Sequence, residues 1–304
     1  MAVAGNESAV QGYYAVAPDG TRIYYDVRGS GERTILIADG FGCDGFNWPY
    51  FFEHFQSTFK IVLVRYRGHG KSEKPYDMHN LTMEHLADDI AAVLNHAELH
   101  RPILMAYSMG VQIALEFVNR NKDAVEALIF VNGNYQYPID TFHDTPTLKN
   151  AFPLLYHAST RYSALVAPMM RFGTSLGLVR RLARHLECNP NLCRQKDIDI
   201  YFEHIGNMDP DLAVRMMNYA SSHSAEPYLP QVKLPALIVA GEKDAFTPMW
   251  VSRLMHERMP TSELFVVKGG THVSYLEQPL AISLRIEKFL RSKGLMEGRL
   301  PIVK

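Results

Sequence analysis

The chain has few cysteines, no long apolar run and almost no net charge. Cys43, Cys188 and Cys193 are the only cysteines among 304 residues, too few for a disulfide framework. No apolar segment approaches the roughly 20 residues that a membrane-spanning helix needs. Residues 1–11 lack the basic start and apolar run of a signal peptide. We therefore expect a cytoplasmic protein without a membrane span.

Motifs for metals, cofactors and nucleic acids are also missing. The net charge of -1 gives no electrostatic footprint for nucleic acid or an anionic membrane. The chain has no Cys-x-x-Cys pair, and its glycine-rich turns do not form the Gly-x-Gly-x-x-Gly of a dinucleotide site. We expect no metal, no cofactor and no nucleic-acid partner. Nothing in the sequence indicates the oligomeric state.

The stretch from Ile103 to Phe117 changes from a strand to a helix almost without a loop. Its first half is apolar, and its second half has helical spacing. Between the halves stands Ala-x-Ser-x-Gly, with Ala106, Ser108 and Gly110. Such a junction must turn sharply and raises its central side chain to the carboxyl edge of the sheet. The pattern predicts a nucleophile elbow with Ser108 as the nucleophile.

The rest of the chain alternates between strands and helices, except in one long segment. Further strands are expected at 13–17, 22–27, 34–38, 60–66, 125–132, 236–240 and 263–267, and helices at 82–94, 248–258 and 280–291. This alternation predicts an α/β fold with a mostly parallel central sheet covered by helices on both faces. In such sheets, sites form at the carboxyl ends of the strands.

Residues 135–230 contain no convincing strand and interrupt this alternation. Helix-like segments are expected there at 147–157, 165–172, 176–187, 196–205 and 212–222. We interpret 135–230 as an all-helical cap, or lid, inserted into a core formed by 1–134 and 231–304. Most of its large apolar residues, such as Met169 and Phe172, are interpreted as the core of the cap. Together they suggest an apolar lid over the site.

The serine motif and its flanks resemble the α/β-hydrolase superfamily over nearly the whole chain. Asp39–Gly42 reads Asp-Gly-Phe-Gly where the family usually has His-Gly-x-Gly. Arg67–Ser72 resembles the family's Arg-Gly-x-Gly-x-Ser turn, although Arg65 stands where an aspartate is common. We interpret His69 and Ser72 of this turn as structural.

The resemblance also supplies partners for the serine. A serine nucleophile needs a histidine base oriented by an acid, and in this fold the order is serine, acid, histidine. Asp244 occupies the acid position of Gly-x-x-Asp-x-x-x-Pro, with Glu242 as the alternative. His272 ends a Gly-x-x-His loop after the next strand. The resemblance therefore implies a catalytic triad of Ser108, Asp244 and His272.

The oxyanion hole is expected from two backbone N–H groups, those of Phe41 and Met109. Asp39 would oppose a developing negative charge unless it points away or is paired. It could simply fix the loop through hydrogen bonds to nearby N–H groups. Cys43 is interpreted as a small structural residue. Substrate contacts are expected from Gly40, Gly42, Trp48 and Tyr107.

These residues predict a serine hydrolase that cleaves a carboxylic ester or lactone of a small to medium hydrophobic substrate through an acyl-enzyme intermediate. The elbow serine disfavours the epoxide hydrolases and haloalkane dehalogenases of this fold, which use aspartate there. C–C bond hydrolases and acyltransferases share the same triad and stay open. A slow-turnover signalling hydrolase also stays open. Gly40–Asp44 followed by Trp48 resembles the oxyanion-loop sequence of bacterial stress regulators and of plant receptors for strigolactone or karrikin.

Overall fold

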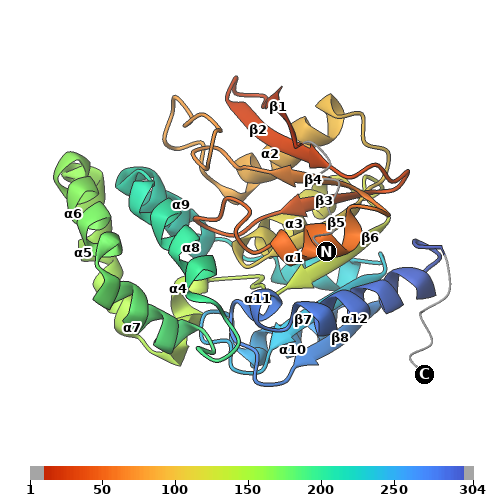
Figure 1. Cartoon of the computed structure of the whole chain (residues 1–304). Coiled ribbons are helices and arrows are strands. Elements are labelled where there is room, and N and C mark those ends of the chain that lie inside the picture. Colours follow the sequence, from red (N-terminus) through yellow and green to blue (C-terminus); the bar gives the residue numbers. More distant parts are fainter. Residues whose placement is uncertain (1–9, 298–304) are drawn as a thin grey trace, which may run out of the picture.

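One sheet runs through the computed structural model, which describes residues 10–297 (Figure 1). Its strands are β1 (Gln11–Val16), β2 (Arg22–Arg28), β3 (Thr34–Ala38), β4 (Lys60–Val64), β5 (Ile103–Tyr107), β6 (Ala127–Val131), β7 (Ala236–Gly241) and β8 (Ser262–Val267). They lie in the order β1-β2-β4-β3-β5-β6-β7-β8. Strand β2 pairs antiparallel with β1 and β4, and the other neighbours pair in parallel. The predicted mostly parallel sheet is confirmed.

Helices cover both faces of this sheet. On one face lie α2 (Met83–His96), α3 (Met109–Arg120) and α10 (Met249–Arg258), and on the other α1 (Pro49–Phe55) and α12 (Pro279–Ser292). Side chains of β3 alternate between the two layers, so Leu36 joins the first core and Ile37 the second. The predicted fold class is confirmed. Helix α1 was not predicted, because its 7 residues are too few to show a period.

A set of helices lies between β6 and β7. These inserted helices are α4 (Pro138–Thr141), α5 (Thr147–Arg161), α6 (Ser163–Ser175), α7 (Gly177–Glu187), α8 (Gln195–Asn207) and α9 (Pro210–Ser222). Figure 1 shows α8 and α9 next to the core, and α5 and α6 beyond them. The helices lie where the sequence predicts them, while the domain boundaries at 135 and 230 stay a prediction. No helix among the described residues is long and apolar enough to cross a membrane.

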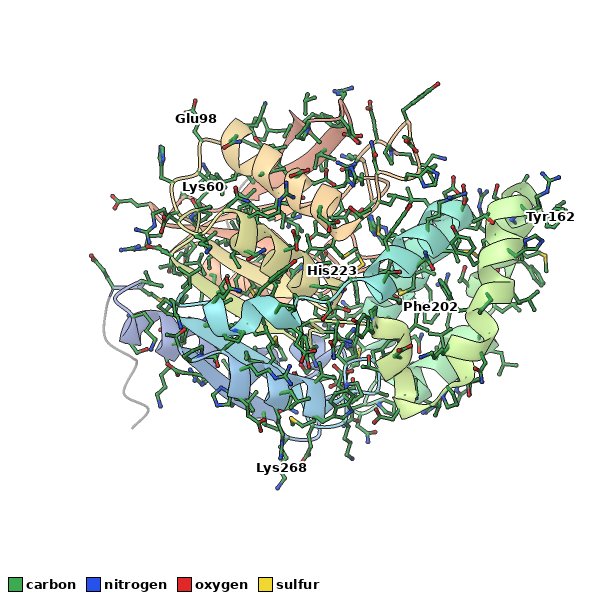
Figure 2. The ribbon with its side chains drawn as sticks, turned by 180° about the vertical axis from the view of Figure 1, so that it is seen from behind. Lys60, Glu98, Tyr162, Phe202, His223 and Lys268 are labelled. Carbon is green, nitrogen blue, oxygen red and sulfur yellow. The ribbon has the colours of Figure 1, made fainter. Side chains whose placement is uncertain are left out.

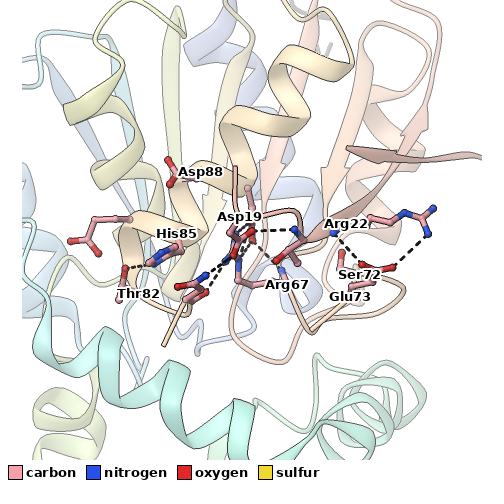
Figure 3. A network of polar contacts seen from close by, with 12 residues as sticks. Asp19, Arg22, Arg67, Ser72, Glu73, Thr82, His85 and Asp88 are labelled. Carbon is pink, nitrogen blue, oxygen red and sulfur yellow. Dashed lines mark hydrogen bonds and ion pairs between the residues drawn. The ribbon is translucent and has the colours of Figure 1, made fainter. Parts of the chain in front are cut away.

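Buried ion pairs fix the loop after β4 (Figure 3). The guanidinium of Arg67 is fully buried, contacts Asp89 of α2 at 2.6 Å and donates to Asp19 of the first hairpin at 2.8 Å. Burial raises the pKa of Asp89 to about 6 although Arg67 opposes this shift. The hydroxyl of Ser72 donates to the carbonyl of Arg65, which accords with a structural role. This loop therefore fixes the positions of β4, α2 and the first hairpin relative to one another.

Candidate active site

Ser108 occupies a sharp turn between β5 and α3. It is the N-cap of α3 and has φ 52° and ψ −122°, a backbone conformation that L-residues rarely adopt. Gly110 is required two residues later, since a Cβ there would lie 2.3 Å from the carbonyl oxygen of Ala38 at the end of β3. The turn predicted from Ala-x-Ser-x-Gly is thus present. It places Ser108 at the carboxyl edge of the sheet and at the amino end of a helix.

The structure brings Ser108, His272 and Asp244 together in one hydrogen-bonded chain. Ser108 Oγ lies 3.0 Å from His272 Nε2, and His272 Nδ1 lies 2.9 Å from Asp244 Oδ2. The three residues come from loops after β5, β8 and β7, which end at the same edge of the sheet. The distances allow the imidazole to accept the serine proton while the carboxylate orients it.

Asp244 is buried, and most of its partners are hydrogen-bond donors. Its Oδ1 accepts from the backbone N–H groups of Phe246 and Thr247 at 2.9 and 2.8 Å. Its Oδ2 accepts from the Thr247 hydroxyl at 2.7 Å and from Asn132 Nδ2 at 2.9 Å. Burial alone would raise the pKa of Asp244, but His272 and Thr247 outweigh it, and the pKa is lowered. The carboxylate therefore stays ionised at neutral pH.

Two aromatic rings and a hydrogen bond to its backbone carbonyl fix the position of His272. The rings of Phe246 and Tyr107 lie on it at centroid distances of 4.8 and 5.2 Å. The Tyr107 hydroxyl donates to the His272 carbonyl at 3.2 Å. The preceding residue, Thr271, is fixed because Glu277 of α11 (Ser274–Glu277) accepts hydrogen bonds from its N–H and hydroxyl. These contacts leave the imidazole little freedom to turn away from the serine.

Sequence reasoning missed Asn132 and Thr247 as supports of Asp244. Asn132 directly follows β6, has φ 47° and also donates to the Thr271 carbonyl at 3.0 Å. Its side chain thereby links the acid loop to the histidine loop. The available signal was its position, a polar residue directly after a buried strand at the edge where Ser108 lies. Thr247 could be recognised only by its place three residues after the acid.

The loop after β3 lies directly against the serine. A Cβ at Gly40 would lie 3.1 Å from Ser108 Cβ and 2.9 Å from the Tyr107 ring. Asp39 is buried and accepts hydrogen bonds from the backbone N–H groups of Gly40 and Gly45, each at 2.9 Å. It therefore fixes the loop through nearby N–H groups, which is one of the two roles that the sequence suggests for it. Burial raises the pKa of Asp39, which disfavours its charged form.

Two further residues of this loop, Gly42 and Cys43, offer no reactive group to the site. The Gly42 N–H donates to His69 Nε2 at 3.0 Å, so this N–H does not point at a substrate. Burial raises the pKa of the Cys43 thiol well above its ordinary value, so the thiol stays protonated. Both observations support structural roles for His69 and Cys43.

An apolar cavity of about 410 Å³ opens over Ser108 and His272. Phe41, Tyr107 and Met109 line it, as the sequence predicts for residues near the serine. The inserted helices contribute further lining residues, namely Leu148, Ala183, Ile198, Tyr201, Phe202, Ile205 and Met217. Trp48 does not line the cavity. It is fully buried behind Tyr107, with ring centroids 6.0 Å apart, and supports the site from below.

One group of potential metal ligands exists among the described residues, away from this cavity. Glu84, Glu116 and His223 place their ligand atoms within 4.8 Å of one another. His223 Nε2 lies 3.2 Å from a Glu116 oxygen, and Gln112 donates to the Ala220 and His223 carbonyls at 2.9 Å. These contacts tie the end of α9 to α3, which accounts for the cluster without an ion.

Acid should destabilise the fold through His69. Burial lowers the pKa of His69 from 6.5 to about 4. The unfolded chain then binds a proton near pH 6.5 and the folded chain only near pH 4, so stability is complete above this window and falls as the pH drops through it. The loss should reach about 3 kcal/mol and is measured by urea unfolding between pH 7 and 4. In His69→Gln, whose amide oxygen can still accept the Gly42 N–H, an equally steep loss would contradict this assignment.

Known proteins resemble the chain over most of its length. A family model described as alpha/beta hydrolase fold matches residues 33–279. The karrikin insensitive 2 receptor CA of Petunia hybrida is 24% identical over 260 residues, covering 83% of this chain and 90% of its own. The 2-hydroxy-6-oxononadienedioate/2-hydroxy-6-oxononatrienedioate hydrolase of Burkholderia vietnamiensis strain G4 is 24% identical over 311 residues, covering 94% and 97%.

Solved structures show the same fold. The esterase EaEST from Exiguobacterium antarcticum superposes with a TM-score of 0.77 at 19% identity, and the match covers 92% of this chain and 100% of that one. The family model spans most of the chain and includes Ser108, Asp244 and His272. The chain therefore belongs to the α/β-hydrolase fold family.

Proposed function

We propose that the chain is a serine hydrolase that cleaves a carboxylic ester or lactone. The hydrogen-bonded chain from Ser108 Oγ through His272 to buried Asp244 is the observation that carries this proposal. Ser108 Oγ attacks the carbonyl carbon, and His272 Nε2 takes the serine proton. His272 then gives that proton to the leaving alcohol. Water, deprotonated by His272, attacks the acyl-enzyme and releases the acid, which restores the serine.

The oxyanion of the tetrahedral intermediate would be held by the backbone N–H groups of Phe41 and Met109. Both residues line the cavity, and Met109 is the first residue of α3, where unpaired N–H groups and the helix dipole favour negative charge. The Gly40 contact with Ser108 brings the Phe41 loop against the nucleophile. Each such donor is typically worth about 10²–10³ in rate.

The cavity favours a hydrophobic substrate of small to medium size. Its lining is dominated by aromatic, aliphatic and sulfur-containing side chains, and the polar residues among it are Ser108, His272, Gln112, Asn134 and Thr247. Residues 135–230 would act as the cap that closes it, because α5, α7, α8 and α9 all contribute lining residues. An apolar acyl or alcohol group would be held by the cap side, with its carbonyl at the serine.

A series of nitrophenyl esters from acetyl to dodecanoyl tests this proposal. We expect steady turnover with a maximum at one acyl length, because a closed apolar cavity gains binding energy with each buried methylene until it is full. Turnover that is absent for every ester and every simple lactone would contradict the proposal. Equal rates across the series would contradict the role of the cavity.

A second candidate is a slow-turnover ligand receptor, which the similarity to the Petunia receptor favours. A C–C bond hydrolase is likewise favoured by the Burkholderia vietnamiensis relative. A receptor would give a single slow burst with tight ligand retention. A C–C hydrolase would leave the nitrophenyl series slow and cleave a vinylogous diketone instead. The ester series therefore separates all three.

A further inference from the structure

The helices farthest from the sheet carry an unusually exposed apolar surface. Seven of the eleven large apolar side chains that are more than half exposed in the described part of the chain lie between residues 154 and 182. Six of them stand on α5, α6 and α7 and define the α5–α7 face: Leu154, Leu165, Met169, Phe172, Leu178 and Leu182. Helix α6 has no buried residue at all. The prediction that Met169 and Phe172 form the core of the cap is wrong, since they are 71% and 67% exposed.

Three of these side chains form a stripe on the side of α6 that is opposite to α8. Leu165, Met169 and Phe172 are spaced four and three residues apart, which places them on one side of α6. The opposite side of α6 packs on α8, where the Thr174 hydroxyl lies 2.1 Å from the position of a Cβ on Gly206. Figure 1 shows α5, α6 and α7 at the edge of the molecule, and Figure 2 shows Tyr162, between α5 and α6, at that same outer edge.

The same helices carry an excess of basic residues, although Lys149 and Arg180 pair with Asp140 of α4 and Asp199 of α8. Residues 147–187 contain six lysines and arginines and one glutamate, although the whole chain has a net charge of -1. The basic residues are Lys149, Arg161, Arg171, Arg180, Arg181 and Arg184. Arg171 and Arg181 are exposed and immediately precede Phe172 and Leu182 in the chain. Arginines flanking exposed apolar side chains on an amphipathic helix are typical of helices that lie in a membrane interface.

The α5–α7 face could contact a second copy of the chain or a lipid bilayer, and its positive charge favours the bilayer. A two-fold dimer would place the same surface on both sides of the interface, so two basic segments would repel each other. An anionic bilayer complements both properties, because its headgroups attract arginine and its acyl boundary accepts apolar side chains. We propose that the α5–α7 face docks on the surface of an anionic phospholipid bilayer.

Docking would place the wall of the cavity against the membrane. Leu148 of α5 and Ala183 of α7 line the cavity that holds Ser108, and Ala183 follows Leu182 of the docking face. An ester dissolved in the bilayer would thus approach the cap helices before it meets water. This delivery role rests on the proposed hydrolase function, whereas the docking does not.

Vesicle sedimentation with the full chain tests the docking. Vesicles of phosphatidylcholine with 30% phosphatidylglycerol should sediment the protein, pure phosphatidylcholine should do so weakly, and salt should reduce the binding. In Phe172→Ser/Leu178→Ser the partition coefficient should fall by roughly 100-fold, since two large apolar side chains are lost. The matched control is Leu280→Ser on α12, which is 65% exposed and should leave the partitioning unchanged.

A charge-reversal pair tests the electrostatic part. Arg171→Glu/Arg181→Glu should lower partitioning by at least about tenfold, while Lys122→Glu/Lys268→Glu, exposed at other sites, should lower it far less. Ser108→Ala should bind as the native chain does, so failure of the hydrolase proposal leaves this result readable. Absence of binding to anionic vesicles, or equal losses in the controls, would overturn the proposal. A dimer that Phe172→Ser/Leu178→Ser abolishes, without vesicle binding, would do so too.

Discussion

Replacing Ser108 by alanine should lower ester hydrolysis by on the order of 10⁶-fold, to the level left by binding and the oxyanion donors alone. The loss is this large because the hydroxyl of Ser108 is the group that is hydrogen-bonded to His272 Nε2. The Cys43 thiol, a second potential nucleophile that lines the cavity, is kept protonated by burial. Steady-state kinetics on the best nitrophenyl ester measures the effect.

Two controls belong with this variant. Cys43→Ala should still hydrolyse the ester, which separates the two potential nucleophiles. Thermal unfolding of Ser108→Ala should match or exceed that of the native chain, since alanine removes only a hydroxyl from a strained turn. Retained turnover in a folded Ser108→Ala variant would refute the proposed nucleophile.

Replacing Asp244 by asparagine should lower kcat by about 10⁴-fold with little change in structure. The reason lies in the donors around this side chain. The Oδ1 atom of Asp244 accepts hydrogen bonds from the backbone N–H groups of Phe246 and Thr247. An asparagine NH₂ in the place of this oxygen would face two hydrogen-bond donors. The NH₂ therefore takes the other position, where it meets only one fixed N–H donor, Asn132 Nδ2, and faces His272 Nδ1. The imidazole is then forced into the tautomer that carries its proton on Nε2, where it cannot accept the serine proton.

Glu242→Gln is the matched control for this prediction. Glu242 is the other acid of the same loop, is exposed, and accepts the Gly269 N–H at 2.8 Å. A glutamine oxygen can keep that hydrogen bond, so kcat should stay near the native value. A larger loss in Glu242→Gln than in Asp244→Asn would exchange the roles of the two acids.

The turn at Ser108 could be predicted from local backbone geometry, because small residues stand between a strand and a helix. Asp244 and His272 were assigned from the resemblance to the α/β-hydrolase superfamily, and they follow strands that parallel pairing brings to one edge. Asn132 escaped prediction because its role depends on a contact with Asp244, 112 residues away in the chain. Such contacts between loops leave no period or spacing in the sequence.

The inserted helices were predicted in position but not in exposure. Helical spacing shows which residues of α6 lie on one side of the helix. It does not show whether that side contacts protein or solvent. Met169 and Phe172 therefore read as core, whereas they are exposed. Trp48 misled in the opposite way, since its match to signalling hydrolases suggested a ligand contact and it lies buried behind Tyr107. The net charge of -1 for the whole chain also hides the basic segment at 147–187.

Labelling with an activated fluorophosphonate, followed by peptide mass spectrometry, tests the central claim most directly. The reagent phosphonylates a serine only where a base activates it and N–H donors hold the developing oxyanion. We predict one adduct, on the peptide that contains Ser108, which is absent in Ser108→Ala and slow to form in Asp244→Asn. A native chain whose Ser108 stays unlabelled while the fold is intact, or an adduct on another residue, would contradict the proposed mechanism.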